Sequence, residues 1–408
     1  MFTAKRTKNV VSGTRGIVYK EALRVQAEGN KVLKMNTGNP AAFGFPVPES
    51  LKKAIAEATE RAAAYSESTG IKEAKEAILA YDLGKGFKNI STGDIYLGNG
   101  VSELAEMICS AMIDPGDEVL CPCPNYNLWT NSVLLADGKP VFYECFEDRN
   151  WMPDSKEIES HVTEKTKAIV VINPNNPTGA LYSDELLLGI CDVARRHGLV
   201  ILADEIYDRL LMDGAKHTSI AALAPDLPVM TFNGLSKSHI VCGFRCGWMT
   251  ASGFTGEDGE AFKTVLETLS SVRLCSNTFA QFCVPAALND PIYTVEMMSP
   301  GGRIYERREA TINAVNEAEC LSVVKNTGAL YCFVRIDPEK VHIKDGNDKQ
   351  FAMQLVRDKH VMIVPGSGFD YPKPNYFRVV MLPEPEELAR AIKDIDDFCK
   401  TYDKKYSR

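Results

Sequence analysis

The sequence predicts an α/β protein with a mostly parallel sheet in a large domain and a smaller α+β domain toward the C-terminus. The 408 residues exceed the length at which one hydrophobic core usually stops growing, so two domains are expected. From about residue 94 to 250, short β-branched runs alternate with helical patterns, as in a parallel sheet with helices on both faces. Beyond residue 300 this alternation stops, and a helix rich in Arg and Glu precedes separate strands.

Six apolar runs are expected to form the strands of the large sheet, at residues 95–97, 118–120, 141–143, 168–172, 199–203 and 229–232. Several of these runs end in polar or glycine-containing turns. Because open α/β sheets bind ligands outside the carboxyl ends of their strands, the chemistry is expected at these turns. The smaller domain is expected to contain strands at residues 328–334, 361–365 and 377–381.

Composition excludes several classes of protein. The hydrophobic fraction of 45% and the charged fraction of 25% are those of an ordinary globular protein. A net charge of −8 argues against wrapping a nucleic-acid backbone, and no stretch approaches the length of a membrane span. The basic start, Lys5, Arg6 and Lys8, leads into polar residues where a secretory signal needs an apolar run, so a cytoplasmic location is expected.

Twelve cysteines are spread over the chain and are expected to be reduced. The closest pairs are Cys121 with Cys123 and Cys242 with Cys246. Neither pair has a second pair at the spacing of a zinc site, so we expect buried apolar cysteines and no metal.

Three polar motifs follow successive strands. Residues 173–179 read Asn-Pro-Asn-Asn-Pro-Thr-Gly, residues 204–207 read Asp-Glu-Ile-Tyr, and Ser236-Lys237-Ser238 precedes Arg245. Each motif has an ordinary explanation: a strand-ending loop, a helix N-cap and a solvated surface lysine, respectively. The specificity therefore lies in the set and its order.

Taken together, Asn-Pro-Thr-Gly, Asp-x-x-Tyr, Ser-Lys and Arg in this order resemble the class I/II aminotransferases, which are fold-type I enzymes of pyridoxal phosphate. Residues 98–104, 173–179, 203–208 and 231–247 look most like bacterial glutamate–pyruvate (alanine) aminotransferases. The resemblance covers nearly the whole chain. It implies a homodimer with shared active sites, a large cofactor-binding domain at residues 46–299 and a small domain at 300–408. Residues 1–45 would join the small domain and the dimer interface.

The resemblance assigns the catalytic roles. Lys237 would bond the cofactor as a Schiff base and shuttle the proton of the substrate α-carbon, with a lowered pKa for the amine. Asp204 would stabilise the protonated ring nitrogen, and Tyr207 and Asn176 would donate to the 3-oxygen of the ring.

The phosphate is expected at a helix N-terminus formed by Gly100, Val101 and Ser102. Many relatives carry a serine where this chain has Gly234, so hydroxyl contacts must come from Ser102, Ser236 or Ser238. Two further contacts are implied by resemblance, from Arg245 and from Tyr65 of the partner subunit. The aromatic residue that stacks on the cofactor matches Tyr126, with Trp129 as a competing candidate.

For the substrate, Arg378 matches the family arginine that holds the α-carboxylate, with Asn176 and the backbone N–H of Gly38 beside it. The expected reaction is L-alanine plus 2-oxoglutarate giving pyruvate plus L-glutamate. Arg15 is a candidate for the distal carboxylate of glutamate, and Arg273 is a further unplaced arginine.

The motifs leave several alternatives open. An aspartate aminotransferase would need a fixed cation for the second carboxylate, and a branched-chain or valine–pyruvate aminotransferase a wider apolar pocket. A lyase or decarboxylase on the same fold would share the cofactor residues. An effector-binding regulator would add a DNA-binding domain, yet only about forty residues precede the family core.

Overall fold

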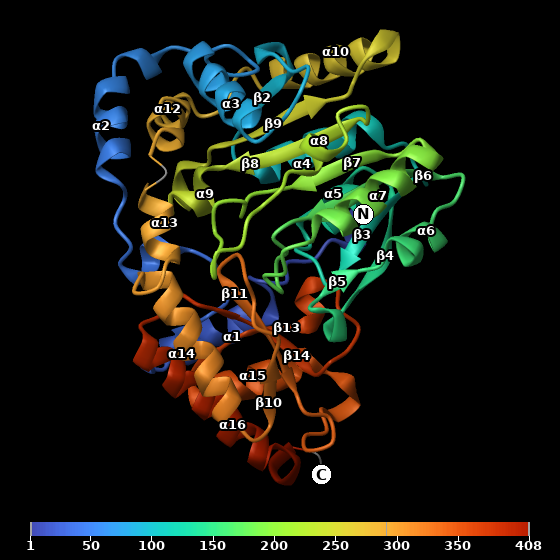
Figure 1. Cartoon of the computed structure of the whole chain (residues 1–408). Helices are drawn as coiled ribbons and strands as arrows, with labels where there is room; N and C mark the ends of the chain where they lie inside the picture. The colour runs from blue at the N-terminus through green and yellow to red at the C-terminus, as the bar shows by residue number, and fades with distance from the viewer. Residues whose placement is uncertain (1, 291, 407–408) are drawn as a thin grey trace.

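The computed structural model describes residues 2–290 and 292–406. An eight-stranded sheet forms the large domain, in the order β2-β9-β8-β7-β6-β3-β4-β5 (Figure 1). The strands β8, β7, β6, β3 and β4 are mutually parallel, while β9 runs antiparallel between β2 and β8. The bounds are β2 Ile95–Gly98, β3 Glu118–Cys123, β4 Lys139–Phe146, β5 Met152–Pro153, β6 Thr166–Ile172, β7 Val200–Asp204, β8 Val229–Gly234 and β9 Gly247–Ser252.

All six strands expected from the sequence are present. The sequence reasoning missed β9, which is buried along its whole length. A strand buried on both faces loses the alternation of apolar and polar residues by which strands are recognised.

Helices cover both faces of the large sheet. One face packs against α4 (Val101–Met112), α5 (Leu128–Leu135) and α10 (Gly256–Val272). The other packs against α6 (Ser155–Ser160), α7 (Asp184–His197) and α8 (Ile220–Leu223). Beyond the β2 edge lie α2 (Glu49–Ala58), α3 (Lys72–Gly84), α11 (Thr278–Gln281) and α12 (Cys283–Leu288). The short α9 (Leu235–Ser238) directly follows β8.

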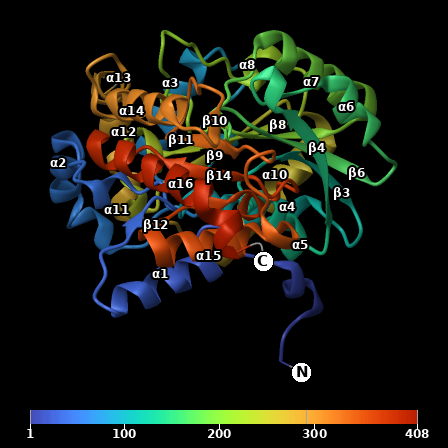
Figure 2. The same ribbon diagram turned by 90° about the horizontal axis from the view of Figure 1, so that it is seen from below.

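A four-stranded antiparallel sheet, β10-β11-β14-β13, forms the smaller unit. Its strands are β10 Leu321–Val323, β11 Tyr331–Ile336, β13 Val364–Pro365 and β14 Tyr376–Val380, and α13 (Ile292–Met298) leads into α14 (Arg303–Glu317). Figure 2 shows α15 (Asp348–Lys359) and α16 (Pro385–Tyr406) in front of this sheet, with α1 (Ile17–Ala27) beside α15.

The N-terminal segment contacts both units. Its strand β1 (Leu33–Lys34) pairs in parallel with β12 (Val361–Met362) of the smaller unit. Ahead of it, the Val11 carbonyl accepts hydrogen bonds from Asn127 and Asn131 at the α5 end of the large unit. The segment therefore connects the two units. Residues 1, 291, 407 and 408 of the expected domain ranges lie outside the described residues.

All twelve cysteines are unpaired, and ten of them are buried. Across residues 2–290 and 292–406, none of the helices combines the length and the apolar character needed to cross a bilayer.

Candidate active site

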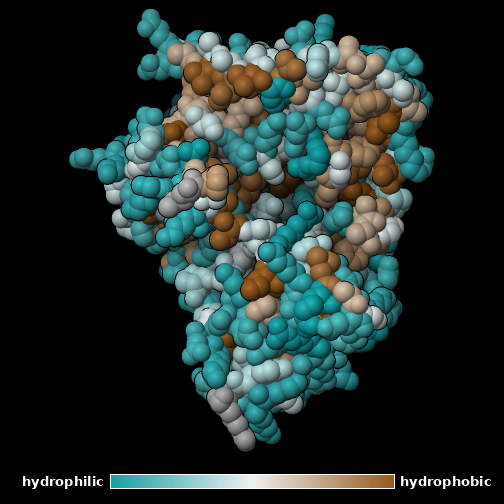
Figure 3. All heavy atoms as spheres, turned by 180° about the vertical axis from the view of Figure 1, so that it is seen from behind, coloured by the Kyte–Doolittle hydropathy of each residue, from teal (hydrophilic) through white to brown (hydrophobic). Residues whose placement is uncertain are grey.

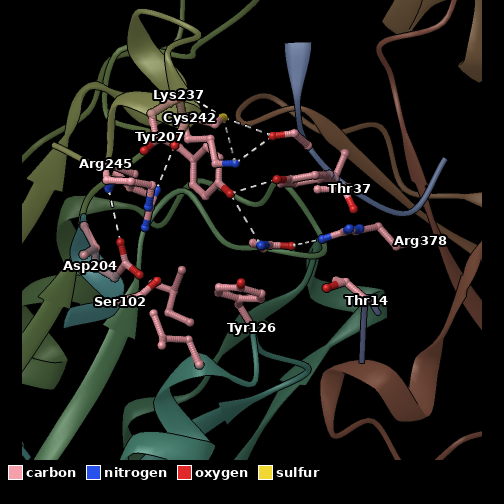
Figure 4. A pocket seen from close by; sticks show the side chains of 18 residues that line it. Thr14, Thr37, Ser102, Tyr126, Asp204, Tyr207, Lys237, Cys242, Arg245 and Arg378 are labelled. Carbon is pink, nitrogen blue, oxygen red and sulfur yellow. Dashed lines mark hydrogen bonds between the residues drawn. The ribbon is translucent and has the colours of Figure 1, made fainter. Parts of the chain in front are cut away.

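A pocket of about 180 Å³ lies between the two units. It is lined by turns of the large sheet, by β11 and β14, and by the N-terminal segment (Figure 4). The lining residues are Thr14, Thr37, Gly38, Val101, Ser102, Tyr126, Leu128, Ile172, Asn176, Asp204, Ile206, Tyr207, Ser236, Lys237, Cys242, Arg245, Tyr331 and Arg378. Turns far apart in sequence meet here because parallel strands end at the same edge of the sheet.

Lys237 extends from α9 into the pocket. Its Nζ donates to the Gly38 carbonyl at 2.8 Å and lies 3.8 Å from the Cys242 sulfur. Burial lowers the pKa of the Lys237 amine, but the acidic groups of Tyr331, Cys242 and Tyr126 outweigh burial, and the net shift is upward. The lowered pKa expected from the sequence depends on the positive charge of the Schiff-base system, which the chain alone does not supply.

Asp204 ends β7 with its carboxylate facing the pocket. Its oxygens accept from the indole N–H of Trp129 at 3.0 Å and from the backbone N–H of Ile206 at 3.3 Å. Burial raises the pKa of Asp204 to about 6. Trp129 thus lies behind the carboxylate in the core, whereas Tyr126 lines the pocket, which favours Tyr126 as the stacking residue.

Two neutral polar groups lie beside Lys237. Asn176, from the turn after β6, donates to the Tyr207 hydroxyl at 3.4 Å. Burial raises the pKa of the Tyr207 phenol far above its usual value, so Tyr207 stays protonated and can donate a hydrogen bond.

The N-terminus of α4 forms one end of the pocket together with Arg245. Gly100 precedes the helix at φ +84, and a Cβ there would lie 2.4 Å from Arg245 Nη2. The guanidinium is held by the carbonyls of Cys242 at 2.9 Å and Asn99 at 3.2 Å. Ser102 and Ser236 line the same pocket. Free helix N–H groups, two hydroxyls and an arginine suit a phosphate.

Arg378 faces this group from β14 across the pocket (Figure 4). Its guanidinium is 1% exposed and donates to Asn176 Oδ1 at 2.9 Å and to the Asn36 carbonyl. Burial lowers the pKa of Arg378. Within the described residues, no carboxylate lies within 4.0 Å of this guanidinium, and its Nε has no hydrogen-bond partner. A buried cation without a counterion is costly, so the site is shaped for an anion that the chain does not provide.

Four of the residues expected at the site lie outside the pocket lining: Gly100, Ser238, Arg15 and Tyr65. Ser238 points away, with its hydroxyl bonded to the Gly234 carbonyl and to His239. Arg15 is exposed next to Thr14, which does line the pocket. Tyr65 is 79% exposed in a separate hollow with Asn277, whose backbone N–H donates to Asn99 beside Gly100.

The pocket also contains residues that the sequence reasoning did not select, among them Thr14, Thr37, Cys242 and Tyr331. Cys242 lies five residues after Lys237, and this spacing was the only available sequence signal. Tyr331 comes from the other unit, and no sequence signal marked it as a pocket residue.

A second group of buried charges lies on the opposite side of the Asp204–Asp208 turn. Lys85 Nζ donates to Glu205 at 2.6 Å and to Asp208 at 2.9 Å. Glu205, Asp208 and His217 could together hold a metal ion, but the Lys85 ammonium already lies against both carboxylates. This group is therefore a closed ion cluster.

Comparison with known proteins identifies the class to which this fold and site belong. The family model of aminotransferase class I and II matches residues 30–395. The chain belongs to this family.

Individual relatives match over almost their full length. The alanine aminotransferase of Mycobacterium bovis is 44% identical, covering 97% of this chain and 92% of that protein. The glutamate-pyruvate aminotransferase AlaA of Escherichia coli is 43% identical, covering 98% of both. A crystal structure of an aminotransferase from Escherichia coli superposes with a TM-score of 0.95 at 42% identity, covering 98% of each chain. The fold is that of these fold-type I enzymes.

Proposed function

We propose that the protein is an alanine aminotransferase that converts L-alanine and 2-oxoglutarate into pyruvate and L-glutamate. The observation that carries this proposal is the buried, unpaired guanidinium of Arg378 opposite Lys237. Both substrates carry an α-carboxylate, and a bidentate anion there would pair the buried charge. The names of the relatives in Mycobacterium bovis and Escherichia coli support the choice of alanine and glutamate.

The pocket residues fit pyridoxal phosphate. The phosphate end is complemented by Ser102, Ser236, Arg245 and the α4 N-terminus, and the ring nitrogen by the Asp204 carboxylate. When bound, the cofactor supplies an electron-withdrawing ring that stabilises negative charge at the substrate α-carbon. Tyr126 would cover the ring, and Asn176 and Tyr207 would donate hydrogen bonds to its 3-oxygen.

Lys237 performs the chemistry that falls to the protein. Its amine would hold the cofactor covalently and would move the proton of the substrate α-carbon. Because the pKa of the free amine is raised, the lowering needed for proton transfer has to come from the positive charge and desolvation that accompany the loaded cofactor. Gly38 accepts a hydrogen bond from the amine and keeps it directed into the pocket.

Accepting both alanine and glutamate creates a conflict. A fixed buried cation suited to the distal carboxylate of glutamate would be unpaired beside the methyl group of alanine. Arg15 avoids this cost because it is exposed, and it follows Thr14, which lines the pocket. We infer that Arg378 holds the α-carboxylate of both substrates and that Arg15 serves the distal carboxylate of glutamate.

The substrate assignment is tested by kcat/KM for alanine, glutamate, aspartate and valine with matched 2-oxo acids. We expect alanine and glutamate to lead. Aspartate or valine exceeding alanine by tenfold, equivalent to about 1.4 kcal/mol, would overturn the substrate pair. An absorbance scan with single amino acids, combined with an assay of the released product, separates transamination from a lyase or decarboxylase reaction. Only transamination releases the 2-oxo acid that corresponds to each amino acid.

We further infer a homodimer in which Tyr65 reaches the phosphate of the partner subunit. Tyr65 lies among exposed apolar residues that share its hollows, Leu274 at 54% and Phe279 at 39% exposure, with Val272 at 79% nearby in sequence. Brown side chains also gather along the right and upper margins of the face in Figure 3. Apolar surface of this kind favours burial against a second copy.

Subunit mixing tests the shared site. Tyr65→Phe and Lys237→Ala are combined at a cofactor concentration that leaves Tyr65→Phe mostly empty. One site of the mixed dimer then carries both changes and the other carries neither, so activity should partly recover. As a control, Arg378→Ala is mixed with Lys237→Ala. These two residues belong to one subunit's site, and each site of that mixed dimer stays defective. Sedimentation showing only active monomers would overturn the inference.

A further inference from the structure

Tyr331 has no role in the function proposed above, although it lines the pocket. It begins β11 in the smaller unit and is 2% exposed. Its hydroxyl lies 3.0 Å from the hydroxyl of Tyr207, and the two rings meet edge to face at 5.7 Å. A residue of the small sheet therefore hydrogen-bonds a residue at the tip of the large sheet.

The Tyr331 hydroxyl also explains why residue 38 is glycine. A Cβ at Gly38 would lie 2.3 Å from this hydroxyl and 3.1 Å from the ring carbon that bears it. The carbonyl of Gly38 accepts the hydrogen bond from Lys237. Tyr331, Gly38 and Lys237 thus form one close-packed group.

The ring of Tyr331 supports Arg378. The guanidinium carbon lies 4.3 Å from the centroid of the Tyr331 ring and 4.6 Å from that of Phe369. Cation–π contacts of this kind are strongest where water is excluded, as it is around this buried arginine. The two rings fix the plane in which the guanidinium can receive a carboxylate.

The hydroxyl of Tyr331 determines what Tyr207 can do. Tyr207 has one hydroxyl hydrogen, so when it donates to an anionic oxygen in the pocket, its own oxygen is left to accept. Two donors face that oxygen, the Tyr331 hydroxyl at 3.0 Å and the Asn176 amide at 3.4 Å. The nearer donor is Tyr331, and a donor chain of this kind strengthens its terminal hydrogen bond.

We propose that Tyr331 is a positioning residue that joins the substrate-carboxylate site to the cofactor site, with its ring holding Arg378 and its hydroxyl directing Tyr207 toward the 3-oxygen of the cofactor. This inference rests on the proposed function. It assigns the two parts of one side chain to two separate tasks, and each part can be removed alone.

The first experiment removes only the hydroxyl, in Tyr331→Phe. The visible absorbance of the protein loaded with pyridoxal phosphate is titrated with pH. A weaker hydrogen bond to the 3-oxygen raises its proton affinity, so the midpoint should rise by about half a pH unit. Tyr207→Phe should raise it further, and adding Tyr331→Phe to Tyr207→Phe should change nothing more. An unchanged midpoint in Tyr331→Phe, or additive shifts in the double variant, would overturn the proposal.

The second experiment removes the ring, in Tyr331→Leu. The KM for alanine should rise about tenfold, whereas Tyr331→Phe should keep it within about twofold, because only the ring contacts the guanidinium. Equal KM values in the two variants would contradict the division of roles.

Tyr143→Phe is the matched control. Tyr143 is fully buried, and its hydroxyl donates to the Val170 carbonyl at 2.7 Å in the core. It should lose stability without moving the midpoint. Failure of the proposed function is recognised separately. If wild-type protein develops no visible band with pyridoxal phosphate, the proposed function and the role of Tyr331 are both refuted. If wild-type protein develops the band and Tyr331→Phe leaves its titration midpoint unchanged, only the role of Tyr331 is refuted.

Discussion

The turn from Asp204 to Asp208 has two faces with opposite electrostatics. On the pocket face, Asp204 and the nearby Lys237 and Arg378 have no ion-pair partner within 4.0 Å among the described residues. On the other face, Glu205 and Asp208 are both paired with Lys85. Asp208 also accepts hydrogen bonds from Tyr81 at 2.5 Å and Asn233 at 2.8 Å.

The two faces distinguish a binding site from a structural ion cluster. Buried charges that the chain pairs by itself stabilise a conformation, while buried charges left unpaired are compensated by a ligand. The closed cluster of Lys85, Glu205 and Asp208 also affects the position of the pocket residues Asp204 and Lys237. Asn233 accepts from the Gly234 N–H as it donates to Asp208, which ties the turn that carries Asp204 to the turn that leads into Lys237.

Removing the Lys237 amine on the pocket face should have the largest effect. In Lys237→Ala, turnover should fall below detection, and borohydride should no longer fix pyridoxal phosphate to the chain, because no amine remains to bond it. Mass spectrometry after borohydride treatment measures the labelling. Full activity in this variant would contradict the assignment, and Lys85→Met, which keeps Lys237, should still be labelled.

Changing the Asp204 carboxylate on the pocket face should have the next largest effect. Asp204→Asn should still bind cofactor but lose turnover by roughly a thousandfold or more, since a charge that stabilises the developing carbanion contributes several kcal/mol. Steady-state kinetics at saturating cofactor measure the loss. Near-normal turnover would show that the ring nitrogen does not depend on Asp204.

Breaking the closed cluster should affect folding first. Lys85→Met leaves Glu205 and Asp208 buried without their cation, which typically costs about 3–5 kcal/mol of unfolding free energy. Denaturant unfolding measures the difference. Lys139→Met is the matched control, because Lys139 pairs with Glu118 while being 67% exposed and should contribute at most about 1 kcal/mol. Equal losses in the two variants would remove the distinction between the clusters.

The smallest effect concerns pH and distinguishes two buried aspartates. Burial raises the pKa of Asp204 to about 6 and that of Asp82, close to Lys85, to about 7. A raised pKa means that the folded state holds the proton more tightly than the unfolded state, so each carboxyl lowers stability as pH rises from about 4 through its folded pKa. Asparagine at either position should therefore gain a few kcal/mol relative to wild type above that window, since each unit of pKa shift corresponds to about 1.4 kcal/mol.

Cofactor should abolish the gain at one position only. Pyridoxal phosphate supplies a cation for Asp204, so Asp204→Asn should lose its advantage in loaded protein, while Asp82→Asn should keep it. Unfolding at pH 5 and pH 8 measures the gain in stability at each of the two positions, with and without cofactor. A gain at Asp204 that survives cofactor binding would contradict the pairing.

Much of the large domain follows from the sequence alone. Its six expected strands formed, and the polar turns after β6, β7 and β8 converge as the rule for parallel sheets requires. Strand periodicity and the placement of polar residues after a strand are local properties, so they can be read before the fold is known. Asn176, Asp204 and Lys237 lie in such turns, and the resemblance to the aminotransferase family assigned their roles.

The tertiary structure alone decided the rest of the pocket. Tyr331 is separated from Tyr207 by more than a hundred residues, and no local pattern marks their contact. Neighbours in sequence also diverge: Ser236 lines the pocket whereas Ser238 turns back toward Gly234, and Trp129 lies behind Asp204 whereas Tyr126 lines the pocket. The direction of a side chain depends on the packing of the elements around it, and that packing is set by contacts between distant segments.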